Sequence, residues 1–296
     1  MNHSNHSKVI LITGCSSGFG LLTAARLSSK GHIVFATMRN LEKKQPLLDE
    51  VRKRGGDVRL LRIDVTDIQS IREAVNTIKN EFGRINILVN NAGYGIGGFF
   101  EDLTEEEIRQ QFDTNFFSVQ NMIREVVPLM RERREGKIIN ISSIAGLYAL
   151  PSFGAYNASK WALEGFSESL YYELKPFGIH VCLIEPGTYN TTIFHGNKRY
   201  AKNSSDANSP YYLLSQFLDQ KVKAFVENTH RDPEDIARLV EKIIDSKNPP
   251  LRNMPDSQSK MIYCLKRILP FRIFSGILAR GMFAGFDLGK LKKPQQ

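Results

Sequence analysis

A tyrosine and a lysine stand four residues apart in the stretch YNASK, as Tyr156 and Lys160. On a helix this spacing places the two side chains on one face, where they can interact. The pKa of a free tyrosine is about 10, and a cationic neighbour lowers it towards neutral pH. Taken alone, such a pair is more often two exposed residues on a helix surface. Beside a carbonyl and a hydride donor, it is typical of a general acid that protonates the oxygen.

A glycine-rich stretch provides the candidate site for that hydride donor. The residues TGCSSGFG, Thr13 to Gly20, directly follow the apolar run KVILIT, and their glycines have the spacing Gly-x3-Gly-x-Gly. Glycine permits a tight turn between a strand and a helix and lets the backbone approach a phosphate closely. The amino end of the following helix then attracts a pyrophosphate. Because no lysine follows the glycines, the stretch predicts a dinucleotide site rather than a P-loop.

The end of the second strand pattern, HIVFATM, indicates which dinucleotide is bound. An NAD site usually has an Asp or Glu about 20 residues beyond the glycines, where it binds the ribose 2′-hydroxyl. Here that place is held by Met38, followed by Arg39. An arginine can bind a 2′-phosphate with two hydrogen bonds, although it can also be a plain surface residue. The sequence therefore favours NADP(H) and leaves NAD(H) open.

These groups must be positioned by the elements around them, and the pattern of apolar residues predicts those elements. Strand patterns occur at residues 8–13, 32–38, 58–65, 85–93, 136–143 and 180–187. Helical patterns occur at residues 21–31, 67–82, 104–134, 155–176 and 232–245, with a capping box at Thr104 and Glu107. The alternation predicts an α/β fold, a Rossmann-type doubly wound parallel sheet flanked by helices. We expect one domain, residues 8–246, with a substrate loop at about 188–231 and a C-terminal extension at 247–296.

The composition indicates a soluble protein in a reducing compartment. The chain has 296 residues, and 42% of them are hydrophobic, which is enough for one large core or two modest ones. The charged fraction of 24% is ordinary for a soluble protein. The three cysteines lack CxxC or zinc spacing, and their odd number argues against a disulfide framework. Without a signal-peptide pattern or an apolar run of about 18 residues, we expect a cytoplasmic protein with no spanning helix. No metal site is expected, because the histidines stand apart from one another, as His180, His195 and His230.

Positive charge is concentrated at the carboxyl end of the chain. The formal net charge is +9, and residues 247–296 carry +8 of it, with ten Lys or Arg and two Asp. Residues 1–246 are almost neutral, so the charge is weak evidence for nucleic-acid binding. From Met261 on, the extension is also apolar. It predicts either a segment that contacts an anionic membrane or a tail that packs over the chain's own pocket or a subunit partner with its charges outward, and we favour the second.

Further motifs in a fixed order carry a resemblance to a known family. They are TGCSSGFG, Asp64-Val65, NNAG at 90–93, Asn115, Ser142-Ser143, YNASK at 156–160 and Pro186-Gly187. Over residues 8 to about 195 the chain resembles the short-chain dehydrogenase/reductase family, and its glycine spacing separates it from the extended, epimerase-like branch. TGCSSGFG followed by ATMR is similar to the steroid- and retinol-metabolising branch. The resemblance implies an oxidoreductase and, by analogy, a homo-oligomer, either a dimer or a tetramer.

The resemblance implies four catalytic residues. Tyr156 is the general acid in reduction and the general base in oxidation, and it binds the substrate together with Ser143, whose hydroxyl holds the substrate oxygen. Lys160 lowers the pKa of Tyr156 and binds the nicotinamide ribose. The backbone of Asn115 holds a water for proton relay to Lys160.

The resemblance also implies a set of residues that contact the cofactor. They are Gly14, Ser16, Ser17, Gly18, Phe19, Gly20, Arg39, Asp64, Val65, Asn91, Ala92, Gly93, Tyr156, Lys160, Pro186, Gly187 and Thr188. Asp64 and Val65 resemble the pair that contacts adenine, and the asparagines of NNAG hold neighbouring strands. The segment 186–188 resembles the loop that lies against the nicotinamide amide.

Bulky apolar residues surround the expected substrate position. They are Tyr94, Ile96, Phe99, Phe100, Phe194, Tyr200, Tyr211, Tyr212, Phe217 and Phe225. Some must belong to the core, but an apolar pocket suits a lipophilic alcohol or ketone, such as a steroid, a retinoid or a long-chain carbonyl. The main prediction is therefore a carbonyl–alcohol oxidoreductase. The alternative is a cofactor-sensing or regulatory protein without turnover, which would not need Tyr156 and its partners.

Overall fold

A parallel sheet forms the centre of the molecule. The computed structural model describes residues 7–189, 198–287, 289 and 291, and within these ranges the sheet has seven strands in the order β3-β2-β1-β4-β6-β7-β9. The strands are β1 Val9–Ile12, β2 Ile33–Met38, β3 Arg59–Arg62, β4 Ile87–Asn90, β6 Gly136–Ile141, β7 Ile179–Ile184 and β9 Arg252–Asn253. Each described neighbouring pair is parallel. β1 is buried along its whole length, as expected for a parallel strand covered on both faces.

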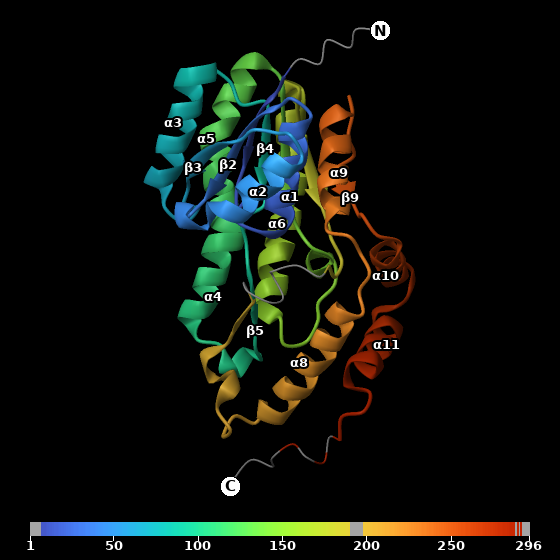
Figure 1. Cartoon of the computed structure of the whole chain (residues 1–296). Helices are drawn as coiled ribbons and strands as arrows, with labels where there is room; N and C mark the ends of the chain where they lie inside the picture. The colour runs from blue at the N-terminus through green and yellow to red at the C-terminus, as the bar shows by residue number, and fades with distance from the viewer. Residues whose placement is uncertain (1–6, 190–197, 288, 290, 292–296) are drawn as a thin grey trace.

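Helices cover both faces of this sheet, so the predicted doubly wound fold is confirmed (Figure 1). On one face lie α1 Gly18–Ser29, α2 Gln45–Lys53 and α9 Glu234–Asp245, which share one apolar cluster with the sheet. On the other lie α3 Ile68–Phe82, α5 Ser118–Arg133 and α6 Gly154–Leu174, which share a second cluster. The carboxyl ends of the strands therefore meet at one edge between two helical layers, where an open α/β sheet binds its ligands.

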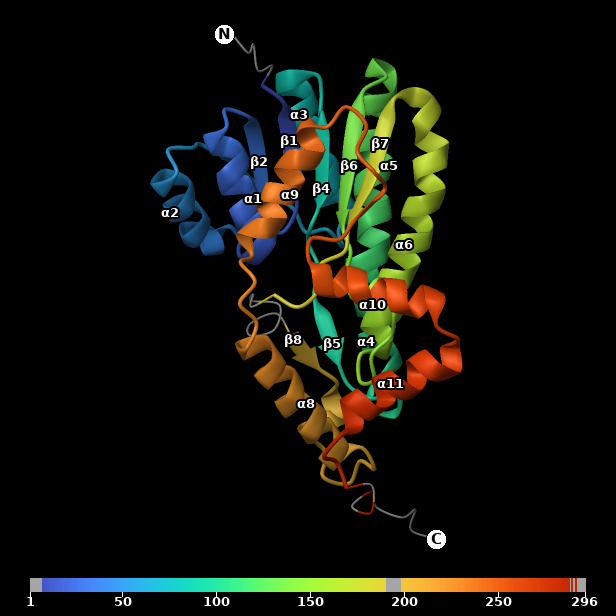
Figure 2. The same ribbon diagram turned by 90° about the vertical axis from the view of Figure 1, so that its right-hand side faces the viewer.

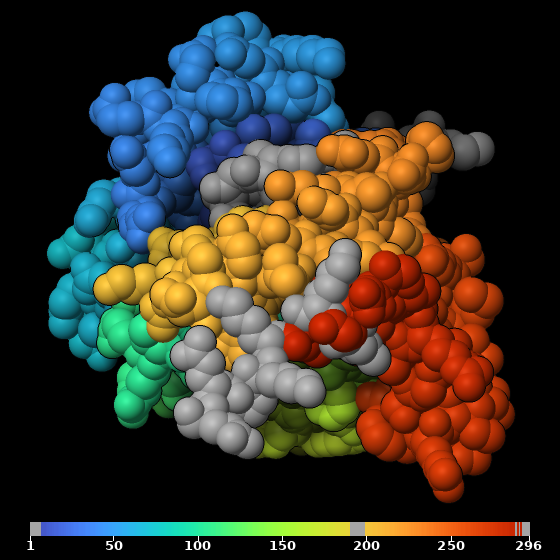
Figure 3. Space-filling view, turned by 90° about the horizontal axis from the view of Figure 1, so that it is seen from below, coloured from blue at the N-terminus to red at the C-terminus, as the bar shows by residue number. Residues whose placement is uncertain are grey.

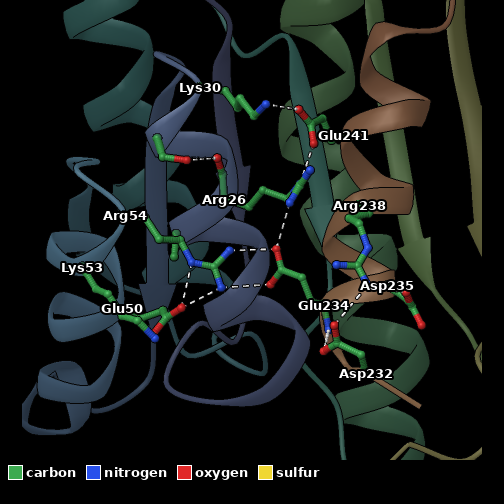
Figure 4. Close-up of polar contacts among 12 residues, drawn as sticks. Arg26, Lys30, Glu50, Lys53, Arg54, Asp232, Glu234, Asp235, Arg238 and Glu241 are labelled. Atoms are coloured by element: carbon green, nitrogen blue, oxygen red, sulfur yellow. Dashed lines mark hydrogen bonds and ion pairs between the residues drawn. The ribbon is translucent and has the colours of Figure 1, made fainter. Parts of the chain in front are cut away.

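An ion-pair network joins the three helices of the first face (Figure 4). Glu234, at the start of α9, pairs with Arg26 of α1 at 3.1 Å and with Arg54, just after α2, at 2.7 Å. Glu241 of α9 pairs with Arg26 and Lys30. These contacts fix α1 against the sheet, and the glycine-rich stretch leads directly into the amino end of that helix.

The predicted helix at 104–134 is interrupted in the structure. It consists of α4 Glu105–Phe112, a π-helical turn at Asp113–Phe117, and α5. The predicted capping box is confirmed, with both Thr104–Glu107 hydrogen bonds present. A π turn inserts one extra residue into a helix that is otherwise continuous, so apolar periodicity alone does not show it.

A smaller layer lies beyond the carboxyl ends of the sheet strands (Figure 2). It contains the parallel pair β5 Gly95–Gly97 and β8 Lys198–Tyr200, helix α8 Tyr212–Glu227, and the C-terminal helices α10 Ser257–Ile268 and α11 Phe271–Phe283. The sequence patterns did not predict these elements, nor α2 and β9. The predicted strand at 85–93 ends at Asn90, and the chain then turns into β5.

The C-terminal extension is attached to the body at several points. Its strand β9 pairs with β7 at the edge of the sheet, although the predicted domain boundary falls at residue 246. Lys221 of α8 donates hydrogen bonds to the carbonyls of Gly281 and Met282, and Figure 3 shows α8 and the C-terminal segment together at this end of the molecule. Among the residues that the structure describes, no helix has both the length and the apolar character of a membrane span. Phe194 and His195 lie outside those residues.

Candidate active site

The glycine-rich stretch packs tightly against the residues that follow β4. Gly14 and Gly18 have φ angles of 73° and 58°, in the left-handed region that favours glycine. A Cβ atom on Gly14 would lie 2.8 Å from the Cα of Ala92, and one on Gly20 would lie 2.4 Å from Nδ2 of Asn91. The glycines are therefore required by close packing, and they leave the backbone of this turn bare, as a phosphate needs.

The amino end of α1 has the charge distribution of an anion site. The helix starts at Gly18, and its first turn has no acidic side chain. Ser16, Ser17 and Phe19 lie in the same turn and are partly buried. Because the first N–H groups of a helix have no partner within it, they present a positive end to a ligand. These residues fit a dinucleotide pyrophosphate.

A cysteine in the middle of the stretch has a structural position. Cys15 is fully buried, and its backbone N–H donates a 2.8 Å hydrogen bond to the carbonyl of Thr37 in β2. Burial raises the pKa of its thiol to about 12, so the thiolate is not formed near neutral pH. The backbone of Cys15 thus links the glycine-rich turn to strand β2.

The paired asparagines join three strands at the same edge. The Asn91 amide donates to the carbonyls of Thr13 and Gly14 at 2.8 and 3.1 Å. The backbone N–H groups of Asn91 and Ala92 both donate to the Thr13 hydroxyl at 3.0 Å. Asn90 donates to Asn140 of β6 at 2.8 Å. The predicted role of the asparagines in holding neighbouring strands agrees with these bonds.

Arg39, Asp64 and Val65 lie at the same edge, directly after β2 and β3. Arg39 is exposed and makes no hydrogen bond or ion pair with the described part of the chain. The Asp64 carboxylate accepts hydrogen bonds from the backbone and the hydroxyl of Thr66. The strand order β3-β2-β1 thus places these residues on the same edge of the sheet as the glycine-rich turn, while their contacts with adenosine remain a prediction.

The predicted catalytic residues come together beyond β6. Ser143 follows this strand, and Tyr156 and Lys160 lie in the first two turns of α6. The Ser143 side chain acts on the pKa of the Tyr156 phenol, and the Lys160 ammonium lies 6.0 Å from the centroid of the tyrosine ring. A phenol, a hydroxyl and an ammonium thus gather at the edge of the sheet that also carries the glycine-rich turn.

Burial is the largest influence on the pKa of Tyr156 in the structure and raises it, while the Ser143 side chain acts in the opposite direction. The predicted lowering of this pKa by Lys160 stays a prediction. The lysine ammonium donates a 2.8 Å hydrogen bond to the carbonyl of Ile141. Burial lowers the pKa of Lys160 to about 8. At neutral pH, Tyr156 is therefore protonated, which is the state that a general acid needs.

Asn115 lies in the π-helical turn and connects the site to α6. Its side-chain oxygen accepts from the N–H of Tyr94 at 3.1 Å, and its amide donates to the carbonyl of Tyr94 at 2.9 Å. The amide also reaches the Ser159 hydroxyl at 3.3 Å. Because π turns are frequent at functional sites, this geometry suits the predicted backbone role of Asn115 without testing it.

Comparisons with known proteins agree on one family. A family model described as short chain dehydrogenase matches residues 8–202. The chain belongs to the short-chain dehydrogenase/reductase family. It is 44% identical over 245 residues to a 3-ketodihydrosphingosine reductase of Bacteroides thetaiotaomicron, covering 83% of this chain and 86% of the relative. It is 36% identical over 273 residues to retinol dehydrogenase 8 of Bos taurus, covering 89% and 86%.

Solved structures place the same fold beside a nicotinamide cofactor. A short chain dehydrogenase/reductase of Burkholderia phymatum in complex with NAD superposes with a TM-score of 0.77 at 26% identity, over 88% of this chain and 93% of that one. This dehydrogenase/reductase is therefore an oxidoreductase with a nicotinamide-binding fold, and its resemblance to the steroid and retinol branch is confirmed.

The loop after β7 is held by two residues that the sequence did not indicate. The N–H of Gly187 donates to the Asp256 carboxylate at 3.2 Å, and Arg231 donates to the carbonyl of Thr188 at 2.8 Å. Arg231 and Asp256 form a 3.1 Å ion pair, with side chains that are only 19% and 9% exposed. A Cβ atom on Gly187 would lie 2.5 Å from the Ser259 hydroxyl of α10. The C-terminal extension thus positions the predicted nicotinamide loop.

Arg231→Met is expected to raise the KM for the nicotinamide cofactor about tenfold, because one charge-assisted hydrogen bond contributes about 1.5–3 kcal/mol. The change removes the donor to Thr188 and leaves Asp256 without its cation. Arg238→Met is the matched control, since its two ion pairs are exposed to solvent. Initial rates over a range of cofactor concentrations measure the effect. An unchanged KM would remove Arg231 from the positioning of this loop.

A cavity of about 490 Å³ lies between β5, β8 and α8 and reaches the start of α6. Its lining includes Tyr200 and Tyr212, two of the predicted pocket residues, together with Phe153, Leu218 and Asp219. Phe153 directly precedes α6, one turn before Tyr156. Ser143, Tyr156 and Lys160 are not in its lining, so the cavity is a candidate for the part of a substrate that lies away from the reacting oxygen.

The other predicted pocket aromatics have different surroundings. Tyr94 and Ile96 form a small core cluster with Ala155. Phe99 stacks on Tyr211 with ring centroids 4.6 Å apart, and Phe217 contacts Phe286 of the extension. Phe100 and Phe225 are 79% and 50% exposed.

Proposed function

We propose that the protein is an NADP(H)-dependent oxidoreductase that interconverts a carbonyl and an alcohol, with Tyr156 as the acid and base. The observation that carries this proposal is the gathering of Ser143, Tyr156 and Lys160 at the carboxyl edge of the sheet, the edge that also carries the glycine-rich turn. A protein that only senses the cofactor needs the turn but has no use for a proton donor buried next to it. The sensing alternative is therefore the weaker one.

Ser143, Tyr156 and Lys160 can perform the steps of the reaction that fall to the protein. The bound nicotinamide supplies or accepts the hydride. Ser143 holds the substrate oxygen by its hydroxyl, and Tyr156 donates its proton to that oxygen during reduction. The Lys160 ammonium, 6.0 Å from the tyrosine ring, stabilises the tyrosinate once the proton has left. The reverse order of proton transfers serves oxidation of an alcohol.

The preference for NADP(H) is assigned to Arg39. Arg39→Asp is expected to lower the ratio of kcat/KM with NADPH to kcat/KM with NADH by about tenfold or more, since it replaces a phosphate-binding cation with an anion. Arg124→Asp makes the same charge change at an exposed position of α5 and serves as the control. Steady-state rates with both cofactors give the ratio. If it stays unchanged, Arg39 does not bind the 2′-phosphate.

The substrate is proposed to be lipophilic, a steroid, a retinoid or a long-chain alcohol or ketone. The cavity near the start of α6 has a mixed lining, with the apolar side chains of Phe153, Leu218 and Val222 beside several serines, Lys202 and Asp219. The names of two relatives, a 3-ketodihydrosphingosine reductase and a retinol dehydrogenase, support the same class. The decisive experiment is a panel of such carbonyls and alcohols with NADPH, NADH and their oxidised forms, followed by nicotinamide absorbance. Cofactor binding without turnover on the whole panel would favour the sensing alternative.

We further propose a cytoplasmic homo-oligomer with a peripheral membrane contact. The three free cysteines support a reducing compartment, and two of them are buried. The oligomer rests on the family resemblance alone. A membrane contact would let a lipophilic substrate enter without crossing water.

A further inference from the structure

The inner face of the α10–α11 pair packs on the body of the protein. Phe274 of α11 is 8% exposed and shares an apolar cluster with Ile144, Leu147 and Tyr148, which follow Ser143 in the chain. The ammonium of Lys266 donates to the carbonyl of Leu147 and lies 4.2 Å from the ring centroid of Trp161. The two helices are therefore fixed to the protein, in agreement with the packing alternative for this face.

The corner between the two helices has the opposite character. Ile268 and Phe271 are 78% and 77% exposed, and they flank the turn at Leu269 and Pro270. Leu269 points into the cluster that anchors the pair. Because the backbone of this turn is fixed, both large apolar side chains stay exposed to water. Such exposure is unfavourable in free energy for a protein that stays in solution.

The exposed apolar surface continues along both helices. In α10, Met261, Cys264, Leu265 and Ile268 follow the spacing i, i+3, i+4, i+7 of one helix face, and all are exposed. In α11, Ile273 and Ile277 are 51% and 59% exposed. The pair is thus apolar on the side that packs inward and also on a second side that faces solvent.

The charges around this exposed apolar surface indicate which kind of partner it can bind. Residues 257–286 contain five cations, Lys260, Lys266, Arg267, Arg272 and Arg280, and no Asp or Glu. Arg267 and Arg272 are exposed next to Ile268 and Phe271. In a two-fold contact between copies of this chain, the same cations would face one another. An anionic lipid surface offers both an apolar interior and compensating charge.

We propose that the α10–α11 corner docks on an anionic membrane, with Ile268 and Phe271 inserted among the acyl chains and Arg267 and Arg272 at the headgroups. The proposal names the residues of the peripheral contact, and it stands apart from the catalytic proposal because binding is measured without turnover. It also places the membrane at the end of the molecule where the strand ends and the candidate substrate cavity lie (Figure 2).

Vesicle co-sedimentation of the full chain tests this docking. Vesicles of phosphatidylcholine with phosphatidylserine are expected to bind the protein, and binding should weaken in pure phosphatidylcholine and at high salt. Ile268→Ser with Phe271→Ser is expected to lower the partition coefficient about tenfold or more, because two buried apolar side chains are lost. Arg267→Gln with Arg272→Gln should lower it by a similar factor. Tyr172→Ser is the control, since Tyr172 is 64% exposed on α6.

Three outcomes would overturn the proposal. The first is no binding of the full chain to the anionic vesicles, and the second is equal binding by the Ile268→Ser, Phe271→Ser variant. The third is a change of oligomeric state in that variant, measured by analytical ultracentrifugation, without any loss of vesicle binding. The third result would instead assign the corner to a contact between copies. Activity on a water-soluble carbonyl should be equal in all variants, which separates this test from that of the catalytic proposal.

Discussion

Tyr156→Phe is expected to lower kcat by roughly 10²–10⁴-fold, the usual contribution of a positioned general acid, while cofactor affinity changes less than about threefold. The substitution removes only the phenol hydroxyl, the group assigned to proton transfer. The ring stays in place, because it packs against Gly95. A Cβ atom added to this glycine would lie 3.6 Å from Cδ2 of the tyrosine ring. Stopped-flow and steady-state rates give kcat, and quenching of intrinsic fluorescence gives the Kd for NADPH.

Tyr171→Phe is the matched control for this prediction, since Tyr171 lies on the same helix α6, four turns from the site. It should leave kcat unchanged. In the unmodified protein, the rate of alcohol oxidation should keep rising with pH through the alkaline range, because a general base must be deprotonated and burial raises the pKa of Tyr156. Substantial turnover by Tyr156→Phe, with the same pH profile, would contradict the assignment of this residue.

The sequence predicted which residues gather at the site better than it predicted their contacts. The spacing of Tyr156 and Lys160 does place both on one face of α6, near Ser143. It does not show that the lysine ammonium binds the carbonyl of Ile141, because that acceptor belongs to a strand 19 residues earlier. Local spacing fixes which way a side chain leaves its helix, whereas its partner depends on the packing of helix on sheet.

Arg231 and Asp256 illustrate the limit more clearly. Gly187 and Asp256 are separated by 69 residues, and neither cation nor carboxylate belongs to a motif. Their position against the loop arises from the way α9 and β9 return the chain to the sheet. Short elements such as β5 and β9 were missed for a related reason, since two or three residues contain too little periodicity to be recognised.

The C-terminal extension packs on the body as the favoured alternative requires, and the membrane contact stays a proposal. An apolar and basic stretch predicts an amphipathic helix without saying which side meets the protein. The structure shows that Phe274 packs inward as the favoured alternative requires, while Ile268 and Phe271 remain exposed. Apolar residues on two sides of one helix pair give no single periodic face, so sequence alone could not separate the two surfaces.

A buried cluster of ionisable side chains lies beside Lys160. Glu164 is one turn beyond Lys160 on α6, and Glu185 directly follows β7, just before Pro186. Their carboxylates are almost fully buried, and both pair with Arg252 of β9, which also binds Glu168 at 2.9 Å. A single arginine from the C-terminal extension therefore binds two buried carboxyl groups, whose pKa values burial raises.

Arg252→Met is expected to lower the free energy of unfolding by about 3–5 kcal/mol, the usual cost of removing one partner from a buried ion pair. Arg72→Met is the control, because its ion pair with Glu125 is largely exposed and contributes about 1 kcal/mol or less. Denaturant unfolding of both variants measures the difference. Adding Glu164→Gln to Arg252→Met should restore part of the lost stability, since the uncompensated carboxylate is then neutral. Equal stability of the two arginine variants would show that Arg252 is dispensable.

The effect of Arg252→Met should also depend on pH in a fixed direction. Burial first, and the charge of Glu164 second, raise the pKa of Glu185 to about 8. Between about pH 4.3, the ordinary pKa of a glutamate side chain, and about pH 8, Glu185 is protonated in the folded protein and deprotonated in the unfolded chain. The free energy of unfolding therefore falls as the pH rises through this range. Without the arginine, the carboxyl is stable only when protonated. The stability lost in Arg252→Met should thus be smaller at pH 6 than at pH 8.5, and a loss that is independent of pH would mean that these carboxyls do not titrate in the folded protein.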